Sequence, residues 1–262
     1  SSVKISSFNI IVLYSYIFLV FLGKKSGSVD VFTQISKVNR GIRVPTYQGD
    51  ILRPKGRSAM NCTECLWPKS TDGTVIVPYN FSSNYSKSWH HSSNIFIHLT
   101  CVRFVPRANE TDFLSIVSDN GCASFLGKVG GDQTVQLDSY GCIYRGIIQH
   151  ELNHALGFYH EQSRSDRDDY VTIHTENIIP GYEGNFNKAD SNNLGLEYDY
   201  SSVMHYSGDA FSKNGNLTIV PKPDPTVPIG QRDGLSILDV SKINRLYQCG
   251  KSPMIRTSLL LF

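Results

Sequence analysis

The hydrophobic pattern divides the chain into three stretches. Residues 10–22 form an almost continuous apolar run, and the polar, basic stretch that follows it up to Cys62 has no sustained apolar period. We expect that polar stretch to be extended and to lie outside the main core. Beyond it, short runs rich in β-branched and aromatic residues lie between turn signals, and they predict a sheet with strands at 74–79, 101–105, 113–117 and 134–137.

Helical spacing replaces the strand pattern after residue 142. Four residues recur at intervals of 4, 3 and 4 and share one stripe of a helix: Ile143, Ile147, His150 and His154. Gly157 predicts the end of this helix, because glycine readily adopts the left-handed conformation with which many helices end. The chain is loop-rich over 191–228, and Ser236 and Asp239 have the spacing of a capping box that opens a terminal helix.

Composition excludes some functions. The 25 basic and 23 acidic residues among 262 leave a net charge of +2, too small a surplus to neutralise phosphates, so nucleic acid is not an expected partner. The apolar run of 13 residues is shorter than the ~20 residues that span a bilayer. We therefore predict a signal peptide at 1–28 rather than a membrane anchor, and the apolar end of the tail 251–262 is too short to anchor the chain.

The cysteines and glycosylation signals indicate one compartment. Six cysteines, an even number, all follow the apolar run and predict three disulfides formed in an oxidising environment, with 15 possible pairings. Five sequons begin at Asn61, Asn80, Asn84, Asn109 and Asn216. Together with the signal peptide, these features predict a secreted, extracellular glycoprotein.

A metal-binding pattern lies on the predicted helix. His150-Glu151-Leu-Asn-His154 places two imidazoles one turn apart on the same face, and the turn at Gly157 lets His160 approach the same point. Three neutral histidines can hold a zinc ion and leave a position for water. Zinc lowers the pKa of that water to about 7, and Glu151 is the candidate general base. For the five-residue pattern alone, two surface histidines on a helical face remain the alternative.

The sequence around this pattern resembles a known family. Residues 150–160, His-Glu-Leu-Asn-His-Ala-Leu-Gly-Phe-Tyr-His, and the following 161–168 are similar to the signature of the astacin family of zinc metalloendopeptidases, within the metzincins. Residues 198–206, Tyr-Asp-Tyr-Ser-Ser-Val-Met-His-Tyr, resemble the Met-turn of that family. The resemblance implies an α+β fold with a zinc protease domain at 58–250. In that fold a mixed, mostly antiparallel sheet and an active-site helix lie over a loop-rich C-terminal subdomain with a terminal helix.

The resemblance also assigns roles. It matches the three histidines to the ligands of one Zn²⁺ per chain and Glu151 to the general base. Met204 matches the methionine beneath the metal. Tyr206 matches the phenol that is the fifth zinc ligand at rest and then stabilises the oxyanion. For a Met or Tyr taken alone, core packing is the alternative.

Latency is a further implication of the resemblance. Residues 47–50, Tyr-Gln-Gly-Asp, resemble the aspartate switch of the astacin propeptide, in which the carboxylate, here Asp50, takes the zinc position that water needs. A surface Gly-Asp turn is the alternative. Residues 29–57 are then a propeptide, which a trypsin-like protease removes after Arg57 to leave Ser58 as the new terminus.

Glu161 follows the last histidine directly. It resembles the buried glutamate that receives the new α-ammonium group of the mature enzyme. A buried carboxylate needs a partner, so an ion pair with Arg164 or Arg167 is the alternative.

The cysteines have family counterparts as well. The resemblance implies three pairings: Cys62–Cys65, Cys101–Cys249 and Cys122–Cys142. The first pair is similar to that of the six-cysteine fish members, the group of the hatching enzymes and nephrosin. A redox-active Cys-x-x-Cys or half of a zinc site is the alternative for this pair.

One segment departs from the family. Residues 86–100 stand where relatives carry a longer amphipathic helix, and about one turn is missing. Its histidines, His90, His91 and His98, are expected in solvent or packing roles because the zinc site is complete without them. The departure puts the stability of the N-terminal part in question, but not the chemistry.

These observations predict a monomeric, secreted zinc metalloendopeptidase that is made as a latent zymogen. Its substrates are proteins or peptides, with egg-envelope glycoproteins as the expected target. A tissue or immune protease of the nephrosin type, with the same chemistry, is the alternative. A non-catalytic zinc-binding protein is the alternative from another class, and the intact Glu151 argues against it.

Overall fold

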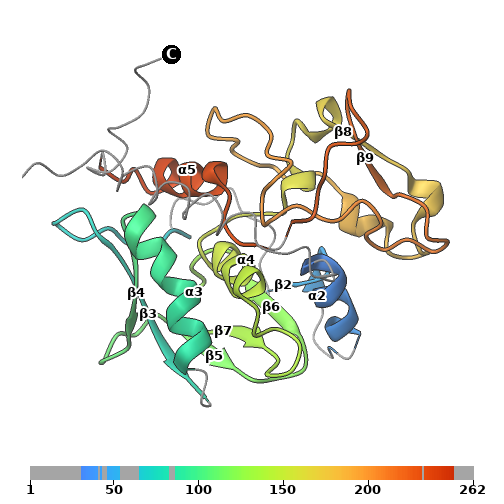
Figure 1. The fold of residues 1–262 in the computed structure, drawn as a ribbon. Coiled ribbons are helices and arrows are strands. Elements are labelled where there is room, and N and C mark those ends of the chain that lie inside the picture. The colour runs from blue at the N-terminus through green and yellow to red at the C-terminus, as the bar shows by residue number, and fades with distance from the viewer. Residues whose placement is uncertain are drawn as a thin grey trace, which may run out of the picture.

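The chain folds into a sheet-and-helix part followed by a largely irregular part (Figure 1). The structure is a computed structural model, and it describes residues 31–40, 42, 46–53, 65–82, 86–231 and 233–250. Helices α3 (Ser86–Leu99) and α4 (Arg145–Ala155) lie side by side on one face of the sheet, and α2 (Val31–Asn39) lies beside α4. This is the predicted α+β organisation.

Seven strands of the described chain form one sheet in the order β1-β2-β6-β7-β5-β3-β4. In chain order they are β1 (Thr46–Tyr47), β2 (Ile51–Leu52), β3 (Val75–Phe81), β4 (Val102–Pro106), β5 (Phe113–Val117), β6 (Cys122–Phe125) and β7 (Asp132–Leu137). Four of them overlap the predicted strands. The others, β1, β2 and β6, are short and were not predicted.

The prediction that this sheet is mostly antiparallel is wrong. Strand β3 pairs in parallel with β4 and β5, β5 with β7, and β2 with β6, whereas only β1–β2 and β6–β7 are antiparallel. Turn-bounded runs favour hairpins. Here helix α3 carries the chain from the end of β3 back to the start of β4, and such a crossover makes neighbouring strands parallel.

The main core lies between the sheet and the two helices above it. Alternate residues of β3 point into it, with Val75, Val77 and Tyr79 buried. Helix α3 contributes Phe96, whose ring meets the edge of Phe104 from β4 at a centroid distance of 5.2 Å. The segment that departs from the family therefore forms a helix of 14 residues, and Phe96 of this helix packs in the main core.

The expectation that the polar stretch before Cys62 lies outside the core is wrong for residues 31–39. They form α2, in which Ile35 is fully buried and Val38, three residues later on the same face, packs against the main core. The Asn39 side chain donates to the Cys122 carbonyl and accepts from the Cys122 N–H. The four apolar residues of this segment, Val31, Phe32, Ile35 and Val38, span fewer than nine residues, which is too short a pattern to predict such a helix.

The C-terminal part is loop-rich, as predicted. It contains four short 3-10 helices, η1 (Glu161–Ser163), η2 (Arg167–Asp169), η3 (Thr175–Asn177) and η4 (Glu183–Phe186), the antiparallel pair β8 (Val171–Ile173) and β9 (Ile219–Pro221), and α5 (Ile237–Leu246). A second apolar cluster fills this part and includes Tyr206. Helix α5 begins with the predicted capping box of Ser236 and Asp239.

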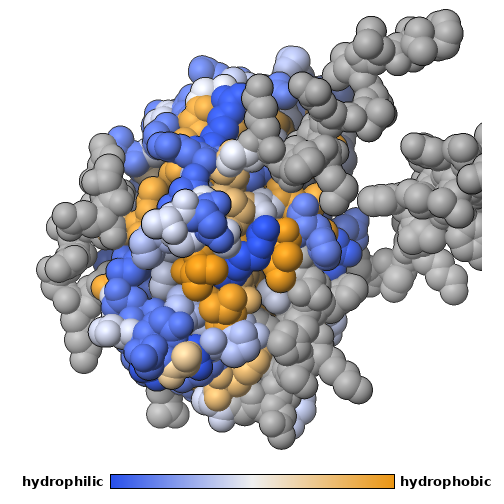
Figure 2. Space-filling view, turned by 90° about the vertical axis from the view of Figure 1, so that its left-hand side faces the viewer, coloured by the Kyte–Doolittle hydropathy of each residue, from blue (hydrophilic) through white to orange (hydrophobic). Residues whose placement is uncertain are grey.

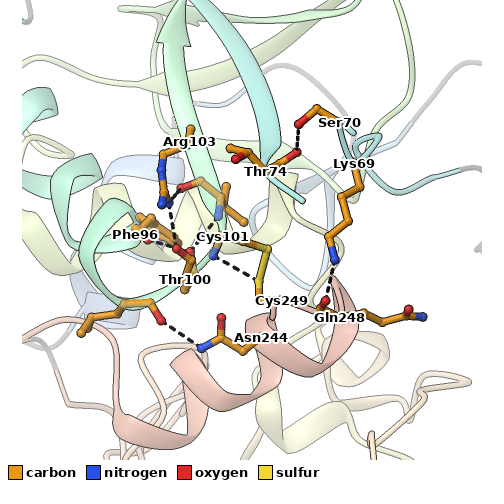
Figure 3. The surroundings of a disulfide bond; sticks show 12 residues. Lys69, Ser70, Thr74, Phe96, Thr100, Cys101, Arg103, Asn244, Gln248 and Cys249 are labelled. Atoms are coloured by element: carbon orange, nitrogen blue, oxygen red, sulfur yellow. Dashed lines mark hydrogen bonds between the residues drawn. A yellow bond between two sulfur atoms is a disulfide. The ribbon is translucent and has the colours of Figure 1, made fainter. Parts of the chain in front are cut away.

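Two disulfides connect these elements. Cys101–Cys249 joins the start of β4 to the end of α5, and the Asn244 side chain donates to the Leu99 carbonyl beside it (Figure 3). Cys122–Cys142 joins β6 to the loop before α4. Both are the pairs that the family resemblance implies, and each contributes about 2–4 kcal/mol, chiefly by constraining the unfolded chain.

The predicted signal peptide at 1–28 and the tail 251–262 lie outside the described residues. Among the helices that the structure describes, none has the length and apolar character needed to cross a bilayer.

Candidate active site

Helix α4 brings the predicted site residues together. His150, Glu151 and His154 lie on it and are buried. The helix ends at Ala155, and the predicted Gly157 follows the cap residue Leu156 with a φ of +104°, which suits glycine. The chain then turns, and His160, buried before η1, faces the same point from outside the helix.

Hydrogen bonds fix the orientation of all three imidazole rings. In each ring Nδ1 donates to an oxygen: His150 to the Val203 carbonyl at 2.9 Å, His154 to the Phe158 carbonyl at 2.7 Å, and His160 to Gln48 Oε1 at 2.9 Å. Carbonyl oxygens only accept, so the proton must lie on Nδ1. Each Nε2 is therefore left with a lone pair that faces the centre of the site.

Asp50 lies between these nitrogen atoms. Its Oδ2 is 3.1 Å from His150 Nε2, and its Oδ1 is 3.4 Å from His154 Nε2 and 3.2 Å from His160 Nε2. The carboxylate of Asp50 therefore lies at the point where the three rings converge.

The four groups fit a zinc ion. One ligand atom from each lies within 4.8 Å of the others. His154 Nε2 and Asp50 Oδ1 are buried and have no hydrogen-bond partner among the described residues, as expected of atoms placed to bind a metal. Burial lowers the pKa of His160 to about 3, which keeps it in the neutral form that binds metals. Neutral imidazoles and a carboxylate are ligands that zinc prefers.

Glu151 lies beside this site, and its carboxylate has no hydrogen-bond partner among the residues that the structure describes. Both of its carboxylate oxygens are buried without a hydrogen bond in the part of the chain that the structure describes. Burial, and then the negative charge of Asp50, raise the pKa of Glu151 well above its usual range. A buried carboxyl group left unpaired is costly for stability, and such groups cluster at functional sites.

The predicted Met-turn supports the site from below. Val203, whose carbonyl accepts from His150, is followed by the buried Met204. The ring of Tyr206 lies 4.6 Å from that of His160, and its hydroxyl donates to the Gln48 carbonyl at 2.5 Å. The phenol is therefore next to a metal ligand, and the 46–52 segment holds its hydroxyl.

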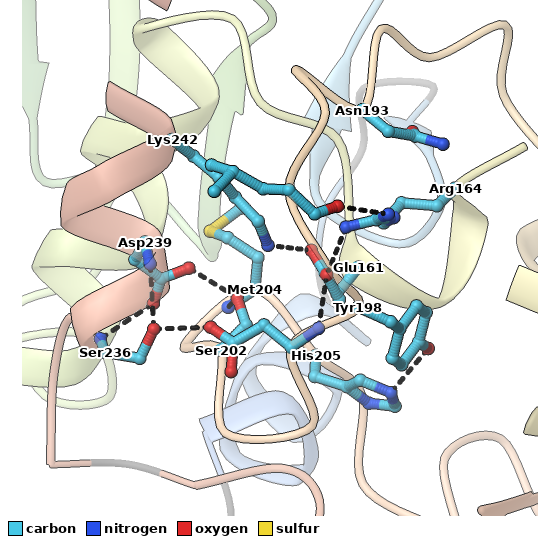
Figure 4. A network of polar contacts seen from close by, with 12 residues as sticks. Glu161, Arg164, Asn193, Tyr198, Ser202, Met204, His205, Ser236, Asp239 and Lys242 are labelled. Atoms are coloured by element: carbon cyan, nitrogen blue, oxygen red, sulfur yellow. Dashed lines mark hydrogen bonds and ion pairs between the residues drawn. The ribbon is translucent and has the colours of Figure 1, made fainter. Parts of the chain in front are cut away.

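Glu161 has two cationic partners (Figure 4). Lys242 from α5 contacts it at 2.5 Å and Arg164 at 3.2 Å, and the carboxylate also accepts from the Asp199 N–H. Burial raises the pKa of Glu161, although both cations oppose this. The alternative pairing with Arg164 is thus present. Arg167 instead donates to the carbonyls of Gln162 and Phe186.

Two residues that hold these groups were not predicted from the sequence. Gln48 contacts both His160 and Tyr206, and it adopts a φ of +51° beside Gly49 at +89°. Its only signal is its place inside the 47–50 motif. The sequence around Lys242 does not indicate its ion pair with Glu161, because the two residues are 81 positions apart in the chain.

Some predicted residues lie outside this site or outside the description. Arg57, Ser58 and Cys62 lie outside the described residues. Cys65 is disulfide-bonded. His98 is exposed, consistent with a solvent role, and the side chains of His90 and His91 are not described.

Three histidines that converge on one point, beside a buried glutamate on a helix over a mixed sheet, define a zinc-dependent metallopeptidase. A sequence model of the peptidase family described as Astacin matches residues 61–248. The chain therefore belongs to the astacin family, and it carries a zinc metalloendopeptidase domain that acts on protein substrates.

Similar proteins include enzymes of hatching. The chain is 51% identical over 228 residues to high choriolytic enzyme 1 of Oryzias latipes. This alignment covers 84% of each of the two chains. The solved structure of that protein, a hatching enzyme zinc-protease, matches with a TM-score of 0.71 and 54% identity over 74% of this chain and 100% of that one. The chain is 59% identical over 230 residues to embryonic protein UVS.2 of Xenopus laevis, covering 86% of this chain but only 45% of that protein.

Proposed function

We propose that the chain is the latent form of a secreted, hatching-type zinc endopeptidase, and that Asp50 keeps it inactive. The observation that supports this proposal most directly is that the Asp50 carboxylate lies within 3.4 Å of all three histidine Nε2 atoms. A carboxylate there takes the position that a reacting water needs. The alternative of a surface Gly-Asp turn does not fit, because Asp50 is fully buried.

The rest of the 46–52 segment supports the same proposal. Strand β2 pairs in parallel with β6 and thereby occupies the backbone hydrogen bonds along that edge of the sheet. An extended peptide substrate binds by adding a strand to such an edge. Gln48 at the same time holds the Tyr206 hydroxyl and the His160 ring. The segment therefore blocks the metal ligands, the phenol and the sheet edge together.

Removal of this segment frees the residues that perform the reaction. Zinc, when bound, supplies Lewis acidity toward the scissile carbonyl and toward water. Glu151 is placed to accept a proton from the attacking water and to pass it to the leaving amine. The Tyr206 hydroxyl, once released from the Gln48 carbonyl, is placed to donate a hydrogen bond to the oxyanion.

Activation by a trypsin-like protease after Arg57 is the simplest route to this state. We expect the full chain to hydrolyse a quenched peptide only after limited trypsin treatment, with Ser58 as the new terminus and with loss of activity on chelation. Full activity of the intact chain before cleavage would contradict latency. No activity after a verified cleavage, with one zinc bound, would contradict the enzyme itself and favour a zinc-binding protein.

Egg-envelope glycoprotein is the substrate we propose, because the similar high choriolytic enzymes of Oryzias latipes carry that activity in their name. The activated chain should then solubilise isolated egg envelopes, and its transcript should appear in embryos before hatching. Activity on casein but not on envelopes, with expression in an adult tissue, would favour a tissue or immune protease of the nephrosin type.

Secretion predicts glycans at particular sequons. Asn109 and Asn216 are exposed on turns of the folded chain, whereas Asn80 lies in β3 with its Oδ1 buried. We expect peptide-N-glycosidase in ¹⁸O-water to label Asn109 and Asn216 of the secreted protein, and not Asn80. Absence of any labelled asparagine on protein recovered from culture medium would contradict the prediction.

A monomer is the oligomeric state we propose. On the face shown in Figure 2, the coloured apolar residues form small groups separated by polar ones. The described part of this face therefore lacks the larger continuous apolar surface that stable association needs.

A further inference from the structure

A buried carboxylate on α5 contacts the Met-turn. Asp239 is only 3% exposed, and its Oδ1 accepts from the Ser202 hydroxyl at 2.6 Å while its Oδ2 accepts from the Val203 N–H at 2.9 Å (Figure 4). The same Oδ2 accepts from the Ser236 N–H at 2.9 Å in the capping box. Capping needs only the contact with Ser236, so the two bonds to the Met-turn, 36 and 37 residues away, call for a second explanation.

Ser202 extends this contact toward the zinc site. Its Oγ accepts from the Met204 N–H at 3.0 Å. That N–H belongs to the same peptide group as the Val203 carbonyl, which accepts from His150 Nδ1 at 2.9 Å. An unbroken series of hydrogen bonds therefore runs from His150 through this peptide group and Ser202 to the Asp239 carboxylate.

All donors in the series have the same direction. The imidazole donates to the carbonyl, the amide to the serine hydroxyl, and the hydroxyl to the carboxylate. Hydrogen bonds arranged in this way polarise one another, and more so in a buried environment of low dielectric. Ser202 is fully buried, and so is the His150 contact. The negative charge of Asp239 therefore increases the acceptor strength of the Val203 carbonyl.

We propose that Asp239 is a positioning residue for the zinc ligand His150, acting through Ser202 and the 203–204 peptide group. It fixes the orientation of the His150 ring and strengthens electron donation from its Nε2 to zinc, as partners of metal-bound histidines do. The inference rests on the zinc site of the proposed function, but it does not depend on latency, because none of these residues belongs to the 46–52 segment.

Two single substitutions separate this role from simple support of α5. Ser202→Ala removes the connecting hydroxyl and leaves the Ser236–Asp239 capping box in place. Ser236→Ala removes the cap, and with it a contact to Asp199, but leaves both Asp239 bonds to the Met-turn. The measurement is the zinc dissociation constant of each full-length variant, obtained by competition with a chromophoric chelator, together with its thermal midpoint.

We expect Ser202→Ala to weaken zinc binding by roughly tenfold and to alter the visible spectrum of the Co²⁺-substituted protein. Ser236→Ala should keep the zinc affinity of the unmodified chain even where its thermal midpoint falls as far. Unchanged zinc affinity in Ser202→Ala would overturn the proposal. Equal loss of affinity in both variants, in proportion to their loss of thermal stability, would also overturn it, because it would show a structural role only.

Discussion

Glu151→Gln is expected to lower kcat/KM of the activated protein by roughly 10²- to 10⁴-fold, the usual contribution of a general base. The side chain is buried next to His150, with no partner for either oxygen among the described residues, so its carboxylate is available for proton transfer. Glutamine has nearly the same shape but cannot accept the proton of the attacking water. Hydrolysis of a quenched peptide after trypsin treatment measures the effect.

The zinc content must be determined in the same sample. We expect Glu151→Gln to retain one zinc, because the three histidines and their Nδ1 partners are unchanged. Glu176→Gln is a matched control, since Glu176 is an exposed glutamate that pairs with His174 on the surface, and it should keep full activity. A Glu151→Gln protein that retains zinc and most of its activity would contradict the assignment of the base.

Asp50→Ala is expected to give the uncleaved chain activity that the unmodified zymogen lacks. The Asp50 carboxylate lies within 3.4 Å of the Nε2 atoms of His150, His154 and His160, in the position that a reacting water needs. Its loss should therefore raise the fraction of open sites, and with it the rate of peptide hydrolysis, by roughly 10- to 100-fold. The rest of the 46–52 segment still covers the sheet edge, so trypsin should raise the rate further.

The assay needs proof that the chain is intact. Mass spectrometry before and after the reaction identifies any self-cleavage, and Asp119→Ala is the control for removal of an exposed aspartate. If the intact Asp50→Ala protein were as inactive in peptide hydrolysis as the unmodified zymogen, this proposal would be wrong. Latency would then come from coverage of the sheet edge by β2 and not from the carboxylate.

The zinc site was predictable because its geometry is local. A spacing of four residues on a helix places His150 and His154 on one face, and a glycine at the helix end brings His160 to the same point. Asp50 is 100 to 110 residues from these ligands in the chain, so only the family resemblance connected it with them. Gln48 was missed because its two contacts depend on the tertiary fold.

The fold was predictable in its class but not in its strand directions. Strand positions follow from local runs of β-branched and aromatic residues, whereas direction depends on where α3 carries the chain after β3. Helix α2 was missed because Ile35 is stabilised by distant packing in the main core. Asp239 was predicted as a helix cap, but its bonds to Ser202 and Val203 join segments that only the tertiary structure brings together.

Anomalous diffraction at the zinc edge from crystals of the uncleaved full-length protein tests the central claim most directly. We predict a single zinc peak bound by the Nε2 atoms of His150, His154 and His160 and by a carboxylate oxygen of Asp50. A peak at the three histidines with Asp50 turned away and water in its place would contradict the proposed basis of latency. A zinc peak elsewhere in the molecule would contradict the active site itself.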